Sequence, residues 1–379
     1  MKRNKAQNYI ISYDKVIFFT YLTLCLIGIL VMLDITSMQS SMNFFYRHVV
    51  FVALGVLTAI LVLHYLNIEK LRVLNYPFVG FAILLLVIVL IQGNTVKGAT
   101  RQLDLGFIGL QPSFIARMAL VFFFAGYLDK KHNQLLESKP LDFLKHFYPM
   151  LTVAVATFTL IILERHLSTL VIGGLTLLTL LTYAGAKKRI VGILVLAAML
   201  LGVVVITMGA EYRGNRIRTY MIYTQFLRNR PEPTNAAEEY QVKESLTALT
   251  SGGIFGTGIG RGRAKHYYLP EARTDYVYTI IGEEFGFIGA MIVFGLHCLL
   301  FFRAFRIANT QESRYLKFLC AGLAMNIFYN ALVNTGVAMS ILPATGNTLP
   351  FISYGGTALI IDSASVGVIL NISAKRRQV

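Results

Sequence analysis

Ten long apolar runs constrain the fold of this chain more than any other feature of its sequence. A run of about 20 apolar residues matches the ~30 Å hydrocarbon core of a bilayer. In lipid, a spanning segment satisfies its backbone polar groups as a helix or in a closed barrel. The sequence therefore predicts an all-α polytopic membrane protein, a single membrane domain over residues 1–379 with ten transmembrane helices. The runs are 15–34, 48–66, 74–92, 113–128, 146–164, 167–185, 190–208, 276–302, 317–341 and 352–373.

The composition supports the same class of protein. The chain is 55% hydrophobic and only 14% charged, whereas a soluble chain carries about a quarter charged residues. Lys and Arg outnumber Asp and Glu, 35 to 19. On a soluble domain this excess would indicate nucleic acid binding, but on a membrane protein it is typical of cytoplasmic loops that fix orientation. We expect no nucleic acid partner.

The positions of the basic residues predict which side each connection faces. Lys and Arg gather in the N-terminal segment, in alternate connections and in the C-terminal tail. Cytoplasmic loops carry such an excess, so both termini are expected in the cytoplasm. The ninth connection, 342–351, contains no Lys or Arg and is expected to lie outside.

The fourth outer loop, 209–275, breaks this pattern because it contains ten Lys and Arg residues. Topology permits this, since loops longer than about 60 residues are translocated largely regardless of charge. Two interpretations stand: a solvated loop near anionic lipid headgroups, or a pocket for an anionic ligand at the outer face. Within the loop, 212–227 alternates basic and apolar residues, which predicts an amphipathic interfacial helix.

Ionisable residues inside the apolar runs require partners. Glu283 and Glu284 lie in the eighth run, where a buried acid costs roughly 2.5–3.5 kcal/mol on insertion scales. Arg117 in the fourth run is the expected partner of one of them. The pair either fixes helix packing or forms one wall of a hydrated substrate cavity. In the ninth run, Asn326, Asn330 and Asn334 recur every four residues and predict hydrogen bonds between helices.

Asp275 directly precedes the eighth run and has two interpretations of equal weight. Asp is a favoured helix N-cap, and Thr274 is an alternative cap. An ionised carboxylate beside a basic loop is also what a general base requires. The preceding glycine-rich segment, 252–262, lacks the third glycine of a dinucleotide-binding motif because Arg261 takes its place. Its flexible backbone is suited instead to closing over phosphates.

Four stretches resemble the FtsW/RodA/SpoVE (SEDS) family of bacterial shape, division and sporulation proteins. YLPEARTDYVYTIIGEEFG is similar to the family pattern YLPE-x-x-TDF…EE-x-G, and NTLPFISYGGTALI is similar to its LPF-SYGG segment. SGGIFGTGIGRGRAKHYYLPE and GATRQLDLGFIGLQPSFIAR are similar to its glycine-rich and QPSE-x-x-K segments. The resemblance covers the whole chain and is nearer FtsW and SpoVE than RodA. The chain departs from the pattern at Gln102, Phe114 and Arg117, where the family has Trp, Glu and Lys.

The resemblance implies a peptidoglycan glycosyltransferase that polymerises lipid II at the outer face of the bacterial cytoplasmic membrane, a multi-pass location. It implies a class B penicillin-binding protein as partner and Asp275 as the essential aspartate. Inverting transfer needs a base on the acceptor hydroxyl. The diphosphate leaving group needs cations, supplied by Arg, Lys or a divalent metal such as Mg or Mn. No cofactor is certain, and Glu271 is the candidate metal ligand.

The remaining candidate site residues follow from these motifs and from the basic loop. The expected substrate-binding residues are Arg101, Gln111, Ser113, Arg213, Arg216, Lys265, Glu271, Arg273 and Ser353. Arg117, Glu283 and Glu284 are expected to form a cavity or ion pair. Two other functions stay open. Glu283 and Glu284 keep a lipid II flippase possible, and the departures at Phe114 and Arg117 keep a non-catalytic scaffold for a transpeptidase possible.

Overall fold

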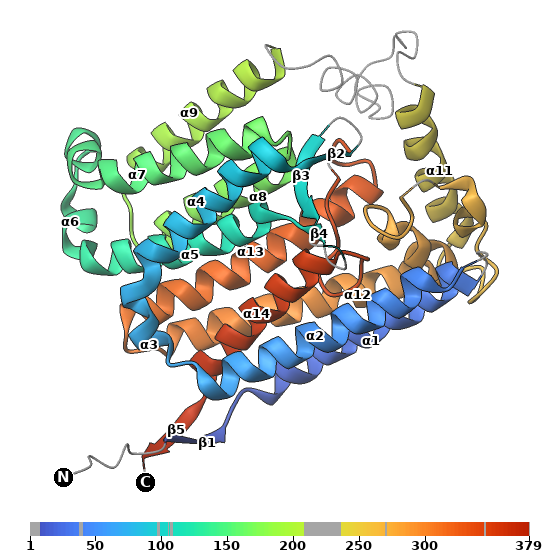
Figure 1. Cartoon of the computed structure of the whole chain (residues 1–379), viewed down its shortest axis with the longest axis horizontal. Helices are drawn as coiled ribbons and strands as arrows, with labels where there is room; N and C mark the ends of the chain where they lie inside the picture. Colours follow the sequence, from blue (N-terminus) through green and yellow to red (C-terminus); the bar gives the residue numbers. More distant parts are fainter. Residues whose placement is uncertain are drawn as a thin grey trace.

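The computed structural model is a bundle of long helices with two small sheets (Figure 1). It describes residues 8–37, 41–96, 99–104, 106, 109–207, 236–269, 271–344 and 346–378. The first half contains β1 (Asn8–Ser12), α1 (Lys15–Ser37), α2 (Asn43–Tyr65), α3 (Ile68–Leu71), η1 (Arg72–Leu74), α4 (Asn75–Gln92), β2 (Asn94–Val96), β3 (Ala99–Asp104), β4 (Gly109–Leu110), α5 (Pro112–Lys130), α6 (His132–Glu137) and α7 (Pro140–Leu163). The second half contains α8 (Leu167–Tyr183), α9 (Lys188–Thr207), α11 (Ala236–Gly252), η2 (Ala264–Tyr268), α12 (Val277–Asn309), α13 (Arg314–Ala338), α14 (Gly356–Ser373) and β5 (Lys375–Gln378).

Each of the ten apolar runs contains a helix. Eight helices of the described residues are long and apolar enough to cross a membrane, with α3 and α4 counted as one span. The helix α8 is apolar but shorter, at 17 residues. A multi-span helical fold is therefore confirmed, and the number of ten crossings stays a prediction.

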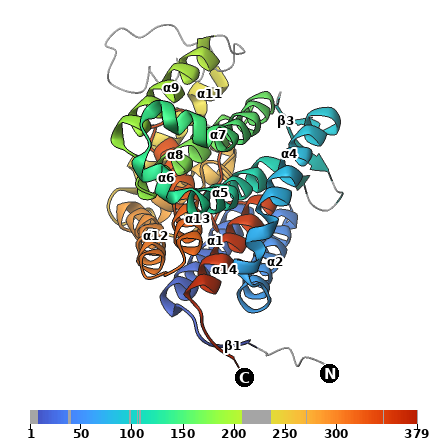
Figure 2. The same ribbon diagram turned by 90° about the vertical axis from the view of Figure 1, so that its left-hand side faces the viewer.

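Three helices form the interior of the bundle. Over an 18-residue apolar stretch of each helix, 78% of the residues are buried in α5 and 72% in α13 and in α14, compared with 28% in α7 and α12. Figure 2 shows α13 and α14 between α12 on one side and α2 on the other. The contact between α14 and α2 is close: a Cβ on Gly367 would lie 2.8 Å from the backbone of Ala59. Small residues allow such close packing of helix backbones in lipid.

The structure corrects the predicted fold in two places and adds detail in a third. The chain is not strictly all-α, because β1 pairs with β5 and β2–β3–β4 form a three-stranded antiparallel sheet. The last helix begins at Gly356 rather than at 352, because residues 350–354 form a turn in which Phe351 has a φ of 67°. The described part of the loop 209–275 contains the helix α11 and the π-helix η2. The predicted interfacial helix 212–227 lies outside the described residues.

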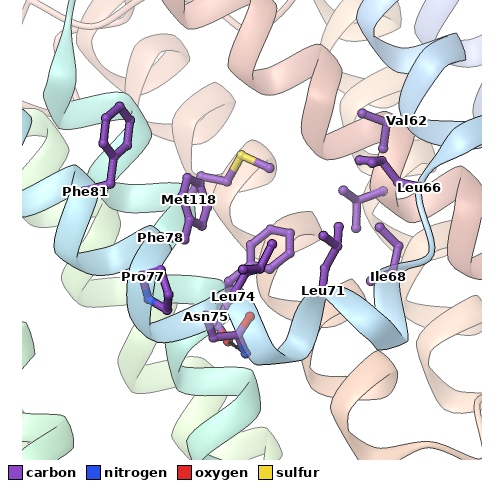
Figure 3. Close-up of a pocket in the computed structure, with 12 residues that line it drawn as sticks. Val62, Leu66, Ile68, Leu71, Leu74, Asn75, Pro77, Phe78, Phe81 and Met118 are labelled. Atoms are coloured by element: carbon purple, nitrogen blue, oxygen red, sulfur yellow. Dashed lines mark hydrogen bonds between the residues drawn. The ribbon is translucent and has the colours of Figure 1, made fainter.

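The bundle has two distinct ends. The strands β1 and β5 bring both termini to one end, and β2–β4 and α11 lie at the other (Figure 1). An apolar groove of about 420 Å³ lies where α3 and the start of α4 face α2, α5 and α14 (Figure 3), and α3 is at the termini end of the bundle. Among the described residues that line it none is ionisable, and Asn75 alone has a polar side chain. The groove therefore lacks the groups that acid–base chemistry requires.

Candidate functional site

Asp275 lies in a tight turn that leads into α12. The turn begins at Glu271, which has a φ of 59°, and the Glu271 carbonyl accepts hydrogen bonds from the amides of Thr274 (3.0 Å) and Tyr276 (3.3 Å). The N-cap residue of α12 is Tyr276, so the prediction that Asp275 or Thr274 occupies the cap position is wrong. The Thr274 hydroxyl donates instead to the Glu271 carboxylate at 3.0 Å. Asp275 is half-buried.

Three successive carbonyls of this turn are held from outside it. The Arg273 carbonyl accepts from the Tyr354 amide (2.9 Å), and the Thr274 carbonyl accepts from the Ser353 hydroxyl (2.6 Å). The Asp275 carbonyl accepts from the side-chain amide of Asn334 at 2.9 Å. The SYGG turn and α13 therefore fix the backbone that carries Asp275.

Ser353 and Arg273, two predicted substrate-binding residues, both belong to this arrangement. Ser353 is 2% exposed, and its hydroxyl oxygen also accepts from the Leu349 amide at 2.8 Å. The guanidinium of Arg273 lies 3.9 Å from the ring centroid of Phe44, which packs edge-to-face on Tyr354. Such a cation–π contact orients the Arg side chain. It places a cation two residues from Asp275.

Glu283 and Glu284 bind the glycine-rich segment rather than a cavity. The Glu283 carboxylate accepts from the amides of Arg263 (2.7 Å) and Ala264 (3.1 Å), and the Glu284 carboxylate accepts from the Gly262 amide (3.2 Å). Both glutamates are 2% exposed. Because internal carboxylates occupy these amides, the amides are not available to close over phosphates.

The cation that pairs with this acidic group is Lys265. Its Nζ lies 2.6 Å from Glu284 and 2.7 Å from Asp34 at the end of α1. The prediction that Arg117 pairs with Glu283 or Glu284 is therefore wrong. Burial alone lowers the pKa of Lys265, but hydrogen bonds to Asp34 and Glu284 and their charges outweigh it, so its pKa is raised above the ordinary value. Lys265 was predicted to bind substrate and is instead 2% exposed in an ion pair.

Arg117 faces a different acid, Asp362 of α14. Its Nη2 lies 4.0 Å from the Asp362 carboxylate, and both side chains are 2% exposed. Phe114, which stands where the family pattern has Glu, lies under the Arg117 guanidinium at 5.2 Å from its ring centroid. Asp362 was not among the predicted site residues. Its position in the tenth apolar run could have identified it, because an acid inside an apolar run requires a partner.

Gln111 and Ser113 form a second polar group, around His166. The Ser113 hydroxyl lies 2.8 Å from His166 Nδ1, and the Gln111 side-chain amide lies 3.5 Å from the same atom. The Thr357 hydroxyl accepts from the Gln111 amide at 3.3 Å and donates to the Gly109 carbonyl at 2.6 Å, and so joins this group to the start of α14, next to the SYGG turn. His166 and Thr357 were not predicted as site residues, because their distant partners are not apparent from sequence spacing.

The structure thus brings Glu271, Arg273, Asp275 and Ser353 together and places Gln111 and Ser113 at the same end of the bundle. Arg213, Arg216 and the side chain of Arg101 lie outside the described part of the chain. Within the residues that the structure describes, no group of three or more His, Cys, Asp or Glu is arranged to hold a metal ion. The fold and the site define a multi-pass membrane protein with an acid held at the end of the bundle opposite the termini.

Comparison with known proteins identifies the family. The FtsW/RodA/SpoVE family model, described as cell cycle protein, matches residues 14–378, and the chain belongs to this family of the bacterial cytoplasmic membrane. It is 34% identical over 96% of its length to the probable peptidoglycan glycosyltransferase FtsW of Haemophilus influenzae, 91% of which is covered. It is 33% identical over 96% of its length to the protein of the same name from Geobacter metallireducens, also 96% covered.

Two solved structures share the fold. A chain from the study "Structural coordination of polymerization and crosslinking by a peptidoglycan synthase complex" superposes with a TM-score of 0.78 at 24% identity, covering 96% of this chain and 98% of that one. The rod shape determining protein RodA of Thermus thermophilus superposes with a TM-score of 0.68 at 23% identity, covering 96% and 97%.

Proposed function

We propose that this chain is a peptidoglycan glycosyltransferase that polymerises lipid II, with Asp275 as the general base. The observation that carries the proposal is the backbone support of Asp275: three consecutive carbonyls of its turn are bonded by Tyr354, Ser353 and Asn334. A base must be held within hydrogen-bond reach of the proton that it removes. The curated relatives, named as probable peptidoglycan glycosyltransferases, support the same activity.

In the proposed reaction a sugar hydroxyl of one lipid II molecule attacks C1 of another. The new C–O bond forms as the bond from C1 to the diphosphate oxygen breaks, and the polyprenyl diphosphate leaves with the electron pair. Asp275 takes the proton of the attacking hydroxyl. Arg273, two residues away, and the arginines predicted from the sequence, Arg101, Arg213 and Arg216, would neutralise the departing diphosphate.

This reaction requires Asp275 at the outer face of the membrane. We therefore propose ten crossings with both termini in the cytoplasm. The pairing of β1 with β5 supports an even number of crossings, because it places both ends of the chain together. We also propose a class B penicillin-binding protein as partner, which would cross-link the strands made here.

The flippase alternative depended on Glu283 and Glu284 as groups of a transport pathway. Both carboxylates are engaged by backbone amides, and Glu284 also pairs with Lys265. No observation among the described residues now favours that function.

The proposal is tested with Asp275→Asn, assayed with purified lipid II, with and without the partner, Mg²⁺, Mn²⁺ and a chelator. We expect polymerisation to fall at least about 10²-fold, the lower range for a general base. Partner co-purification and the unfolding temperature in detergent should stay near the wild-type values. Wild-type polymerisation by this variant would rule out the base role. A rate that depends on added cation would identify the metal requirement, and Glu271→Gln would then test the candidate ligand.

A further inference from the structure

We infer that Asn334 of α13 is a positioning residue for Asp275. This inference rests on the proposed function, in which Asp275 is the base. Asn334 does not touch the reacting atoms. It acts through the backbone of the turn that carries the catalytic carboxylate.

A single side-chain nitrogen of Asn334 joins two separate loops. Asn334 Nδ2 donates to the carbonyl of Asp275 at 2.9 Å and to the carbonyl of Asn347 at 2.5 Å. Both partners are acceptors, so the atom that faces them must be the amide nitrogen rather than the oxygen. Asn334 is 1% exposed. Its two N–H groups therefore fix the Asp275 turn against the segment that precedes the SYGG turn.

The asparagine is itself held by a line of buried polar groups. Asn347 Nδ2 donates to the Asn330 carbonyl at 3.2 Å. Asn347 therefore accepts a hydrogen bond from α13 through its carbonyl and donates one to α13 through its side chain. One helical turn before Asn334, Asn330 Nδ2 lies 3.4 Å from the Asp362 carboxylate of α14, which faces Arg117 of α5. The line of groups links three interior helices to Asp275. It gives Asn330 and Asn334 polar partners inside the bundle.

Asn326 provides a matched control on the same helix. It lies on the same face two turns earlier and is also 1% exposed. Neither polar atom of its side chain has a hydrogen-bond partner among the described residues. Replacement of Asn326 by Leu therefore changes a buried asparagine of α13 without touching the Asp275 turn.

The first experiment compares Asn334→Leu with Asn326→Leu in the lipid II polymerisation assay. We expect Asn334→Leu to lower kcat about 10- to 100-fold, because small displacements of a catalytic group have effects of this size. Its KM for lipid II should stay within about twofold, and Asn326→Leu should keep wild-type kinetics. Equal kcat values for the two variants would overturn the inference. So would a loss in Asn334→Leu that appears only in KM.

The second experiment does not depend on activity. Hydrogen–deuterium exchange of the purified proteins should be faster in peptides covering 271–281 and 346–356 for Asn334→Leu than for Asn326→Leu. Unchanged exchange in these peptides would refute the inference even if the enzyme is slowed. Asp275→Asn distinguishes a failure of the base role of Asp275 from a failure of the positioning role of Asn334. If it is active, the base role fails, and the exchange result alone decides whether Asn334 holds the turn.

Discussion

Asp275 and the pair Glu283–Glu284 are acids of one short segment with different surroundings. Asp275 is half-buried in a turn whose backbone is bonded by other elements, whereas both glutamates are buried and accept bonds from backbone amides. A buried carboxylate that accepts such hydrogen bonds stabilises the structure, because breaking them would leave a buried charge without compensation. A partly exposed carboxylate stays accessible to a substrate hydroxyl. The degree of burial, not the residue type, therefore separates the candidate base from the structural acids.

Replacement of Lys265 by Met tests the structural role of the acidic pair. The variant leaves the buried carboxylate of Glu284 and the partly buried carboxylate of Asp34 without their cation, and breaking a buried pair costs about 3–5 kcal/mol. We expect a correspondingly lower free energy of unfolding in detergent. The control is Arg303→Met, which removes a pair with Asp14 at 2.8 Å in which the Arg303 side chain is 35% exposed. This pair is partly exposed, and ion pairs contribute less toward the surface, where they are worth about 0–1 kcal/mol. Equal losses in the two variants would therefore contradict this account.

The loss of stability in Lys265→Met should depend on pH in a defined direction. The folded-state pKa of Lys265 is raised, so its contribution to stability is complete below the ordinary Lys pKa of about 10.4 and is lost as pH rises through the folded value. The difference in unfolding temperature between wild type and Lys265→Met should therefore be constant between about pH 7 and 9. It should narrow only at higher pH.

At the scale of elements, the helices were predictable and their interruptions were not. Apolar runs located all eight helices that are long and apolar enough to cross a membrane, because a span in lipid requires about 20 apolar residues in sequence. The break in α12 at Gly286, the late start of α14 at Gly356 and the sheet β2–β3–β4 depend on contacts between distant segments. For the same reason the sequence indicated that Glu283 and Glu284 need partners but named Arg117 instead of Lys265. It identified Asp275 through a motif, not through its environment.

Gly286 is the position where α12 and the glycine-rich segment depend on each other. Its φ of 67° and ψ of −168° are essentially restricted to glycine. A Cβ there would lie 2.3 Å from the Gly256 amide nitrogen and 2.4 Å from the Ile254 carbonyl oxygen. This close approach lets the segment 253–258 exchange backbone hydrogen bonds with 283–288.

We expect Gly286→Ala to lower the free energy of unfolding by at least about 1–3 kcal/mol, because the backbone conformation is strained for alanine. The control is Gly295→Ala in the same helix, where a Cβ would meet nothing within 4 Å. There alanine should be neutral or stabilise by up to about 1 kcal/mol. Chemical denaturation of both variants in detergent measures the difference. A similar stability of Gly286→Ala and wild type would show that α12 continues unbroken through this position.

The two ends of the bundle carry different groups. The termini end carries the β1–β5 pair and the apolar groove of Figure 3. The opposite end carries the Asp275 turn, the SYGG turn and the group around His166, which the starts of α5, α12 and α14 bring together. This division is useful to a polymerase only if the second end faces the outside, where the growing glycan strand lies.

The orientation is testable with single cysteines in a variant that lacks Cys25, Cys298 and Cys320, using a membrane-impermeant maleimide. Arg261→Cys lies in the exposed glycine-rich segment near the candidate site, and Glu312→Cys lies exposed between α12 and α13. We expect Arg261→Cys to react in intact cells and Glu312→Cys to react only after permeabilisation, because Arg303, Arg306 and Arg314 mark that connection as cytoplasmic. The reverse labelling would place Asp275 on the cytoplasmic side, where it has no access to lipid II at the outer face, and the proposed function would fail with it.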